Sequence, residues 1–188
     1  MSKPINVALI YGSVREGRFC DKVADWAAAE IEGYGGYSLD RIDPKAHGFG
    51  AESIDAPTLN NIRARLAFAD AFVVVTPEYN HGYPGALKLL IDSASREWHA
   101  KPVAFVSYGG ISGGLRAVEQ LRLVFAELHA TTIRDSVSFA NVWELFDSAG
   151  QPPPSANKAM SALLRQLSWW AHALRDAREA GAYMPAAA

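Results

Sequence analysis

The stretch LIYGSVREGRFCDKVADW, residues 9–26, decides the fold. Its apolar beginning continues a run over residues 5–11 that predicts a strand buried on both faces. The run stops at Gly12 and Ser13, and from Phe19 onward apolar residues recur at the spacing of a helix. A buried strand, a short glycine-containing turn and an amphipathic helix in that order are typical of a parallel α/β sheet.

Four further apolar runs predict strands, at residues 37–42, 71–76, 103–107 and 131–137. Apolar residues at helical spacing fill the intervals, at residues 19–27, 59–66, 87–98, 115–128 and 160–174. The alternation of strands and helices predicts a parallel sheet covered on both faces through right-handed crossover connections. Two longer connections, residues 44–57 and 140–155, are of the kind that is often functional.

The composition is that of an ordinary soluble protein. Of the 188 residues, 49% are hydrophobic and 20% charged, and the net charge of −2 does not suit a general nucleic-acid binder. The single cysteine, Cys20, excludes an internal disulfide, and the five histidines have no metal-ligand spacing. The N-terminal run is too short for a membrane span and lacks a signal-peptide pattern, so we expect a cytoplasmic protein. We expect one domain over residues 1–180 and a disordered tail over residues 181–188.

The turn at residues 12–18 combines groups that suit an anion. Gly12 and Gly17 let the backbone approach a ligand closely, and Ser13 offers a hydroxyl. Arg15 and Arg18 add donors suited to phosphate oxygens, beside the unpaired amides of the helix predicted to follow. Cations at a helix N-terminus oppose its dipole by about 0.3–1 kcal/mol each, a penalty that a bound anion reverses. A phosphate-binding turn and a solvated turn with two surface arginines both fit these residues.

Two later turns follow the third and fourth predicted strands. The first of them, TPEYNHGYPG at residues 76–85, places aromatic rings and amides together, which suits a planar heteroaromatic ligand; His81 is a candidate donor there. The bland alternative is a rigid turn that starts the next helix at Pro84. The other turn, SYGGISGG at residues 107–114, offers bare glycine backbone, with Tyr108 available to stack. Ligands of doubly wound sheets bind outside the carboxyl ends of the strands, where all three turns are expected.

Residues 110–114, GISGG, also match the G-x-S-x-G pattern of serine hydrolases, with Ser112 as the nucleophile. Two features count against this interpretation. The serine of a nucleophile elbow should lie at the strand end, but Tyr108, Gly109 and Gly110 intervene; and the only histidine after Asp135 and Asp147, His172, falls inside a predicted helix. Triad histidines usually occupy loops. A serine hydrolase is therefore a minor alternative.

Taken in order, the three turns resemble those of the NAD(P)H-dependent FMN reductases, a flavodoxin-like family that includes quinone, azo and metal-ion reductases. The resembling motifs are Gly12-Ser13-x-Arg15, then Pro77-Glu78-Tyr79-Asn80 with Gly82 and Pro84, then Ser107-Tyr108-Gly109-Gly110 with Gly113-Gly114-Leu115-Arg116. The likeness extends from about residue 7 to residue 174, and the Pro-Glu-Tyr-Asn segment is its most specific part. It implies a flavodoxin-like three-layer sandwich with a five-stranded parallel sheet in the order 2-1-3-4-5.

The resemblance also implies roles for individual residues. Ser13, Arg15 and Arg18, with amides near Phe19 and Cys20, would hold the FMN phosphate. Arg18 departs from the serine or threonine that many relatives have at this position. The remaining FMN contacts that the resemblance implies, mostly through backbone amides that bind and enclose the isoalloxazine, come from Gly12, Pro77, Glu78, Tyr79, Asn80, His81, Gly82, Ser107, Tyr108, Gly109 and Gly110.

The activity implied by the resemblance is hydride transfer from NADPH or NADH to FMN, followed by reduction of a small acceptor in a ping-pong cycle. Free flavin, a quinone, an azo compound or a metal ion could be that acceptor. FMN would carry the chemistry, so no side chain is needed as a general acid. Relatives are commonly homodimers or homotetramers, and the apolar faces of the third and last helices are candidate interfaces. A flavodoxin-type electron carrier is the non-enzyme alternative, although such carriers are usually strongly acidic.

Overall fold

The chain forms a five-stranded parallel sheet in the order β2-β1-β3-β4-β5, which confirms the predicted topology. The computed structural model describes residues 3–50 and 53–183. The strands are β1 (Ile5–Tyr11), β2 (Tyr37–Ile42), β3 (Ala71–Pro77), β4 (Pro102–Tyr108) and β5 (Thr131–Phe139). The first two match the predicted boundaries; β3 and β5 end one and two residues later than predicted, and β4 is one residue longer at each end.

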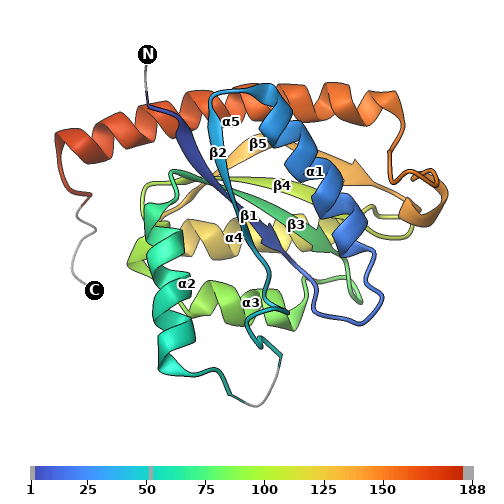
Figure 1. The fold of residues 1–188 in the computed structure, drawn as a ribbon, viewed down its shortest axis with the longest axis horizontal. Helices are drawn as coiled ribbons and strands as arrows, with labels where there is room; N and C mark the ends of the chain where they lie inside the picture. The colour runs from blue at the N-terminus through green and yellow to red at the C-terminus, as the bar shows by residue number, and fades with distance from the viewer. Residues whose placement is uncertain (1–2, 51–52, 184–188) are drawn as a thin grey trace.

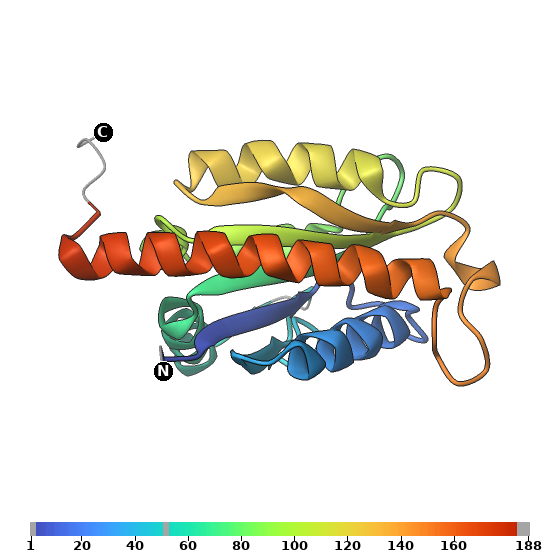
Figure 2. The same cartoon turned by 90° about the horizontal axis from the view of Figure 1, so that it is seen from above.

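Helices cover both faces of the sheet and complete three layers (Figure 1). One layer contains α1 (Cys20–Tyr34) and α5 (Pro154–Ala180), and the other contains α2 (Ala56–Phe68), α3 (Gly85–Asp92) and α4 (Leu115–Glu127). Two short 3₁₀ helices, η1 (Arg96–Trp98) and η2 (Val142–Glu144), lie in connections. Figure 2 shows α5 running along the sheet.

Alternate residues of the strands feed two separate hydrophobic cores, because successive side chains of a strand point to opposite faces. Leu9 of β1 packs in the core beneath α1 and α5, whereas its neighbour Ile10 packs beneath α2, α3 and α4. Every residue of β3 and β4 is buried, as the continuous apolar runs predicted. This double burial fixes the central strands, and with them the turns that leave their carboxyl ends.

The third helix is shorter than the spacing of its apolar residues indicates. Apolar residues continue at helical spacing to Trp98, but α3 ends at Asp92 and Trp98 belongs to η1. The Ser93 hydroxyl donates to the carbonyl of Leu90 at 2.7 Å, and the Ser93 amide donates to the carbonyl of Leu90 as well as that of Leu89. A serine that bonds back to the preceding turn competes with helix continuation. Trp98 is nevertheless buried, and its indole N–H donates to the carbonyl of Ile91.

The predicted tail divides at the limit of the described residues. Gly181, Ala182 and Tyr183 are described, and the Tyr183 hydroxyl lies 3.0 Å from Nδ1 of His129. Residues 184–188 of the predicted tail, and residues 51–52 of the predicted long connection, lie outside the described residues.

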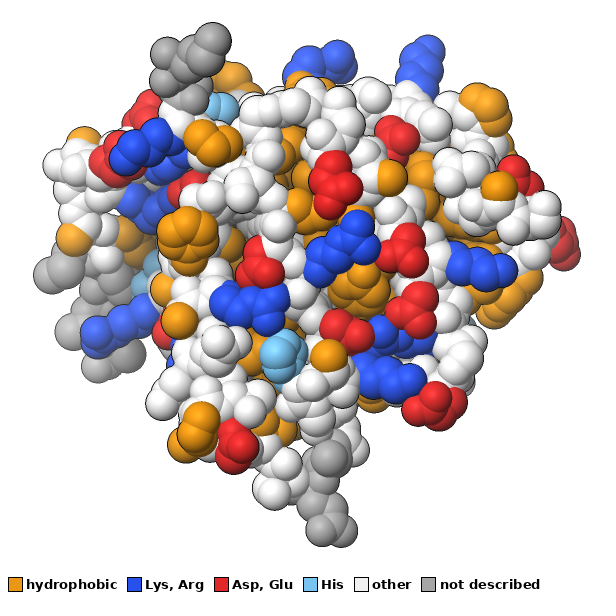
Figure 3. Space-filling model, in the orientation of Figure 1, with side chains coloured by type: hydrophobic (Ala, Val, Ile, Leu, Met, Phe, Trp, Pro, Cys, Tyr) orange, Lys and Arg blue, Asp and Glu red, His pale blue; other side chains and the backbone are white. Residues whose placement is uncertain are grey.

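The surface carries both signs of charge. Figure 3 shows lysine and arginine side chains interspersed with aspartate and glutamate over the face that Figure 1 presents. Over residues 3–50 and 53–183, none of the helices combines the length and apolar character that crossing a membrane requires.

Candidate flavin site

The turns that follow β1, β3 and β4 leave the sheet at the same end (Figure 1). Since β2 pairs on one side of β1 and β3 on the other, the strand order reverses between the first two connections. Ligands of open α/β sheets bind at such a reversal, outside the carboxyl ends of the strands. The three predicted turns therefore meet at the expected place.

The first turn starts with a close approach to β3. The Gly12 amide donates to the carbonyl of Val75 at 2.7 Å, and a Cβ at Gly12 would lie 2.6 Å from that oxygen. No side chain fits in that space, so the residue type of Gly12 is set by the packing of β1 against β3. Ser13 follows and is fully buried.

Ser13 and Arg15 both contact Tyr79 of the second turn. The Ser13 and Tyr79 hydroxyls are 2.6 Å apart, and the Arg15 guanidinium lies 3.5 Å from the centre of the Tyr79 ring. The amide of Arg15 donates to the Ser13 hydroxyl at 3.4 Å. A hydroxyl and an exposed cation thus sit together where the first two turns touch.

The start of α1 supplies further donors. Phe19 occupies the N-cap position and makes no side-chain capping bond, and the first helical hydrogen bond runs from the Val23 amide to the Phe19 carbonyl. The amides of Cys20, Asp21 and Lys22 precede that bond and point out of the helix end. Uncapped amides with the positive end of a helix dipole suit a phosphate.

Arg18 lies in a different environment from the one expected of a phosphate ligand. Its side chain is only 5% exposed, and its guanidinium forms ion pairs with Asp43 and Asp21. Arg15, by contrast, is exposed. Of the two arginines predicted to bind phosphate, only Arg15 is exposed, with its guanidinium over the Tyr79 ring.

Phe19 and Cys20 contribute to the turn mainly as backbone. The Cys20 thiol is buried beneath the turn, 3.9 Å from the carbonyl of Val75, and burial raises its pKa. The Phe19 ring is half-buried and packs edge-on against Phe146. Neither side chain points to a phosphate, whereas both amides lie at the uncapped helix end.

The second turn is a tight hairpin. Tyr79 and Gly82 exchange two backbone hydrogen bonds of 2.9 and 3.1 Å, and Asn80 and His81 between them both have positive φ, at 51° and 68°. Left-handed backbone at two consecutive non-glycine residues costs free energy and is common at ligand sites. Gln120 of α4 holds the turn by donating to the His81 carbonyl at 2.8 Å.

Glu78 ties the second turn to the third. Its amide donates to the Tyr108 carbonyl at 3.0 Å, and its carboxylate, 7% exposed, accepts from both the amide and the guanidinium of Arg116. Burial by itself raises the pKa of Glu78, but hydrogen bonds from Arg116 and Ser112 outweigh burial and lower it. In the sequence, Arg116 stands out only as the last residue of the third resembling motif. Its contact with Glu78, 38 residues away in the chain, could not be predicted from the spacing.

The third turn is shaped by buried serines and glycines. Ser107 is fully buried and donates to the Gly113 carbonyl at 2.8 Å, as does Ser138 from β5. Gly114 has φ of +85°, and a Cβ there would lie 2.7 Å from Cβ of Ser107. The hydroxyl of Ser107 is thus engaged within the turn, while Gly110 lies partly exposed at the rim.

The expectation that Tyr108 is available to stack on a ligand is wrong. Tyr108 is 4% exposed, and its ring packs 6.4 Å from that of Phe19, between α1 and the sheet. Burial raises the pKa of its hydroxyl. Alternation along β4 points this side chain into the core, and the backbone of Tyr108 and Gly109 is hydrogen-bonded to Glu78, Phe139 and Val142.

The serine-hydrolase interpretation finds no support in the contacts of Ser112. Ser112 helps to lower the pKa of Glu78, and among the described residues it makes no hydrogen bond to a histidine. His172 lies within α5, and its Nδ1 bonds the carbonyl of Ser168 in the same helix at 2.8 Å. A serine and a histidine engaged in this way do not form a nucleophile–base pair.

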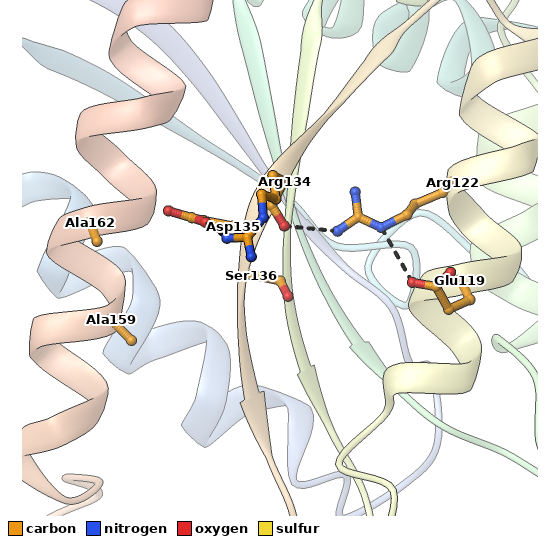
Figure 4. Close-up of a pocket in the computed structure, with 7 residues that line it drawn as sticks. All are labelled: Glu119, Arg122, Arg134, Asp135, Ser136, Ala159 and Ala162. Atoms are coloured by element: carbon orange, nitrogen blue, oxygen red, sulfur yellow. Dashed lines mark hydrogen bonds and ion pairs between the residues drawn. The ribbon is translucent and has the colours of Figure 1, made fainter.

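A separate groove of about 670 Å³ lies beyond the edge strand β5 and away from the three turns. Figure 4 shows Arg122 and Glu119 reaching from α4 on one side, and Ala159 and Ala162 on α5 on the other. Arg122 donates to the carbonyls of residues 133 and 134, which are backbone acceptors of this free strand edge. The groove is polar and open, and we assign the flavin site to the rim because the anion donors and flat surfaces gather there.

Comparisons with known proteins identify the family of the chain. Residues 5–144 match the family described as NADPH-dependent FMN reductase. An NAD(P)H-dependent FMN reductase of Schizosaccharomyces pombe is 35% identical over 119 residues, which span 57% of this chain and 60% of that protein. An NAD(P)H:quinone oxidoreductase of Solanum tuberosum is 34% identical over 162 residues, or 80% of this chain and 78% of that protein.

Solved structures show the same fold at low sequence identity. The apo form of an NADH:FMN oxidoreductase has a TM-score of 0.68 and 21% identity, and covers 90% of this chain and 89% of that chain. A Streptococcus pneumoniae flavodoxin has a TM-score of 0.60 and 14% identity, with 87% and 98% covered. The fold alone is therefore common to reductases and electron carriers, and the sequence match over residues 5–144 decides between families: the chain belongs to the NADPH-dependent FMN reductase family.

Proposed function

We propose that this protein binds FMN at the rim and uses NAD(P)H to reduce a small acceptor. The phosphate lies against Ser13, Arg15 and the amides at the start of α1, and the ring system lies between the second and third turns. One observation carries the assignment: Ser13 and Arg15 both contact Tyr79, at 2.6 Å and 3.5 Å, so the phosphate donors adjoin the predicted ring site.

The fit rests on the chemistry of the donors. A phosphate monoester needs several N–H or O–H donors and positive charge, and the first turn offers a hydroxyl, an exposed guanidinium and uncapped amides. The ring carbonyls and nitrogens of a flavin need backbone donors beside flat surfaces, and the candidates are the amides of Asn80, His81 and Gly110, which have no backbone acceptor among the described residues.

FMN, when bound, would accept hydride from NAD(P)H and then donate hydride to the acceptor, in a ping-pong cycle. The protein's part is position and electrostatics. The Glu78–Arg116 ion pair and the Gln120–His81 bond fix the second turn against α4, so its amides keep their direction through both halves of the cycle. No side chain is assigned the transfer of a proton.

Quinones are the acceptor class that we propose first, supported by the name of the potato relative. Free flavins, azo compounds and metal ions are the other acceptors to compare. The connection after β2 adjoins the site, because a Cβ at Gly50 would lie 3.3 Å from the Val14 side chain of the first turn. We propose that residues 44–50 of this connection shape one wall of the acceptor site.

Purification and one spectrum test the proposal. The protein is expected to retain FMN or to take it up with quenching of flavin fluorescence, and NADPH or NADH is expected to bleach the absorbance near 450 nm anaerobically. A quinone then restores the absorbance. Uptake of FMN without bleaching would indicate a flavodoxin-type carrier. No uptake of FMN, with labelling of Ser112 by a fluorophosphonate, would indicate a hydrolase.

We further propose a homodimer or homotetramer. Support comes from exposed apolar side chains on the two helices predicted as interfaces: Leu89 of α3 is 55% exposed and Trp169 of α5 is 64% exposed. Leu123 of α4 is 75% exposed as well. Sedimentation equilibrium gives the assembly state, and a monomer at micromolar concentration would contradict this proposal.

A further inference from the structure

Arg18 is a buried cation in an exposed turn. Arg15, Glu16 and Gly17 are exposed, yet the Arg18 side chain retains only 5% of its exposure. A guanidinium is withdrawn from water at a large cost unless its donors are all paired. The hydrogen-bond partners of Arg18 therefore indicate its role.

Every nitrogen of the Arg18 guanidinium donates at least one hydrogen bond within the protein. Nε donates to Asp21 Oδ1 at 2.8 Å, and Nη1 and Nη2 donate to the two oxygens of Asp43 at 2.8 and 2.5 Å. Nη2 also pairs with Asp21 Oδ1 at 2.7 Å, and Nη1 donates to the carbonyl of Ser13. Four of the five N–H groups of Arg18 are therefore hydrogen-bonded within the protein, and the remaining one belongs to Nη2, which lies against Asp21.

Asp43 is itself held in place. It directly follows the last residue of β2, and its Oδ1 accepts from the Lys45 amide at 2.9 Å. Hydrogen bonding to Asp43 raises the pKa of Arg18 further. The carboxylate thus anchors Arg18 to the end of a strand, through a bidentate geometry that only arginine can make.

The bond to the Ser13 carbonyl transmits this anchoring to the phosphate turn. The carbonyl and the following amide of a trans peptide point in opposite directions. Turning the Ser13 carbonyl toward Arg18 therefore turns the Val14 N–H away from Arg18. The Asp43–Arg18 pair sets the direction of a backbone donor in the turn that we assign to phosphate.

We propose that Arg18 is a positioning residue, fixed by Asp43, that orients the Ser13–Val14 peptide toward the FMN phosphate, while Arg15 is the arginine that contacts the phosphate. This inference rests on the proposed function. It makes a prediction of unusual sign. Arg18, Asp21 and Asp43 together carry one net negative charge, so removing the charge of Asp43 should by Coulomb's law alone favour phosphate binding. Positioning predicts weaker binding instead.

The test compares FMN with riboflavin, which lacks the phosphate. The apoprotein is titrated with each ligand. The dissociation constant for riboflavin divided by that for FMN measures the contribution of the phosphate to binding. We expect Asp43→Asn to lower this ratio about tenfold, and Arg15→Ala to lower it by a similar or larger factor. Arg18→Lys is expected to behave like Asp43→Asn, because an ammonium cannot bind both oxygens of Asp43 and reach the Ser13 carbonyl. Asp25→Asn removes an equal charge from exposed α1 surface and is expected to change the ratio less than about twofold.

A second measurement does not depend on the variants folding. In the ¹⁵N-labelled wild-type protein, the Arg18 Nε–H resonance should be protected from exchange and should not move when FMN binds, whereas that of Arg15 should shift. An unchanged or larger ratio in Asp43→Asn, or an FMN-dependent shift at Arg18 alone, would overturn the inference. A wild-type protein that binds no FMN would overturn the proposed function, and equal binding of FMN and riboflavin would remove the phosphate site from it.

Discussion

Replacing Gly12 by alanine tests how closely the first turn packs against β3. The added Cβ would lie 2.6 Å from the Val75 carbonyl oxygen and 2.9 Å from Cα of Thr76. Ordinary contacts of a Cβ begin at 3.4 Å, so the first turn would have to move about 0.8 Å from β3. Both neighbours are backbone in the middle of the sheet and have no rotamer by which to yield.

The cost follows from two effects. The Gly12 amide bonds the Val75 carbonyl at 2.7 Å, and losing that bond costs about 1 kcal/mol. Overpacking of a rigid interior adds about 1–3 kcal/mol. We therefore expect Gly12→Ala to lower the free energy of unfolding by about 2–4 kcal/mol. The same movement separates the Ser13 and Tyr79 hydroxyls, now 2.6 Å apart, and should weaken FMN binding at least about tenfold.

Urea denaturation and fluorescence titration with FMN measure the two effects. Gly85→Ala is the matched control, because Gly85 begins α3 near the same rim and a Cβ there meets nothing within 4 Å. That control should be between neutral and about 1 kcal/mol more stable than the wild type. A Gly12→Ala protein with wild-type stability and wild-type FMN affinity would refute the close packing of the first turn on β3.

Three further predictions concern single side chains. Tyr79→Phe leaves the buried Ser13 hydroxyl without its 2.6 Å partner and should lower the unfolding free energy by about 1–2 kcal/mol in urea melts; no loss would mean that this bond is not formed in solution. Burial by itself raises the pKa of Asp43, but the Arg18 guanidinium outweighs burial and lowers that pKa. The extra unfolding free energy of wild type over Asp43→Asn should therefore be complete above about pH 4 and shrink as the pH falls further. Urea melts of both proteins at a series of acid pH values check the sign. Burial lowers the pKa of Lys101 to about 8, so between pH 8 and 10 the unfolded state binds a proton that the folded state does not. Over that range the unfolding free energy of wild type should rise by up to about 3 kcal/mol relative to that of Lys101→Met. No such rise would contradict the burial of Lys101.

Much of the fold could be predicted from the sequence because the central strands are buried on both faces. Continuous apolar runs at β1, β3 and β4 leave little ambiguity about the sheet, and regular helical spacing between them implies crossover connections. The order of the strands came from the resemblance of the three turns to a known family. The end of α3 was harder to predict, because the Ser93 hydroxyl bonds the preceding turn and stops the helix although apolar residues continue at helical spacing to Trp98.

The candidate site was predictable as a set of turns, but not as a set of side-chain directions. Because β4 extends to Tyr108, the alternation of side chains along the strand points the Tyr108 ring into the core. The glycines that follow suggested instead that Tyr108 lies in an exposed loop. Arg15 and Arg18 look alike in sequence. Only the fold brings Asp43, 25 residues further along the chain, against Arg18 and leaves Arg15 exposed beside Tyr79.

The central claim is that one flavin phosphate and one flavin ring occupy the rim of the sheet. A crystal structure of the protein with FMN tests it most directly. We expect the phosphate within hydrogen-bond distance of the Ser13 hydroxyl and the amides at the start of α1, and the ring between residues 77–82 and 107–114. FMN bound instead in the polar groove between Arg122 and Arg134, or a rim that stays empty at saturating FMN, would contradict it.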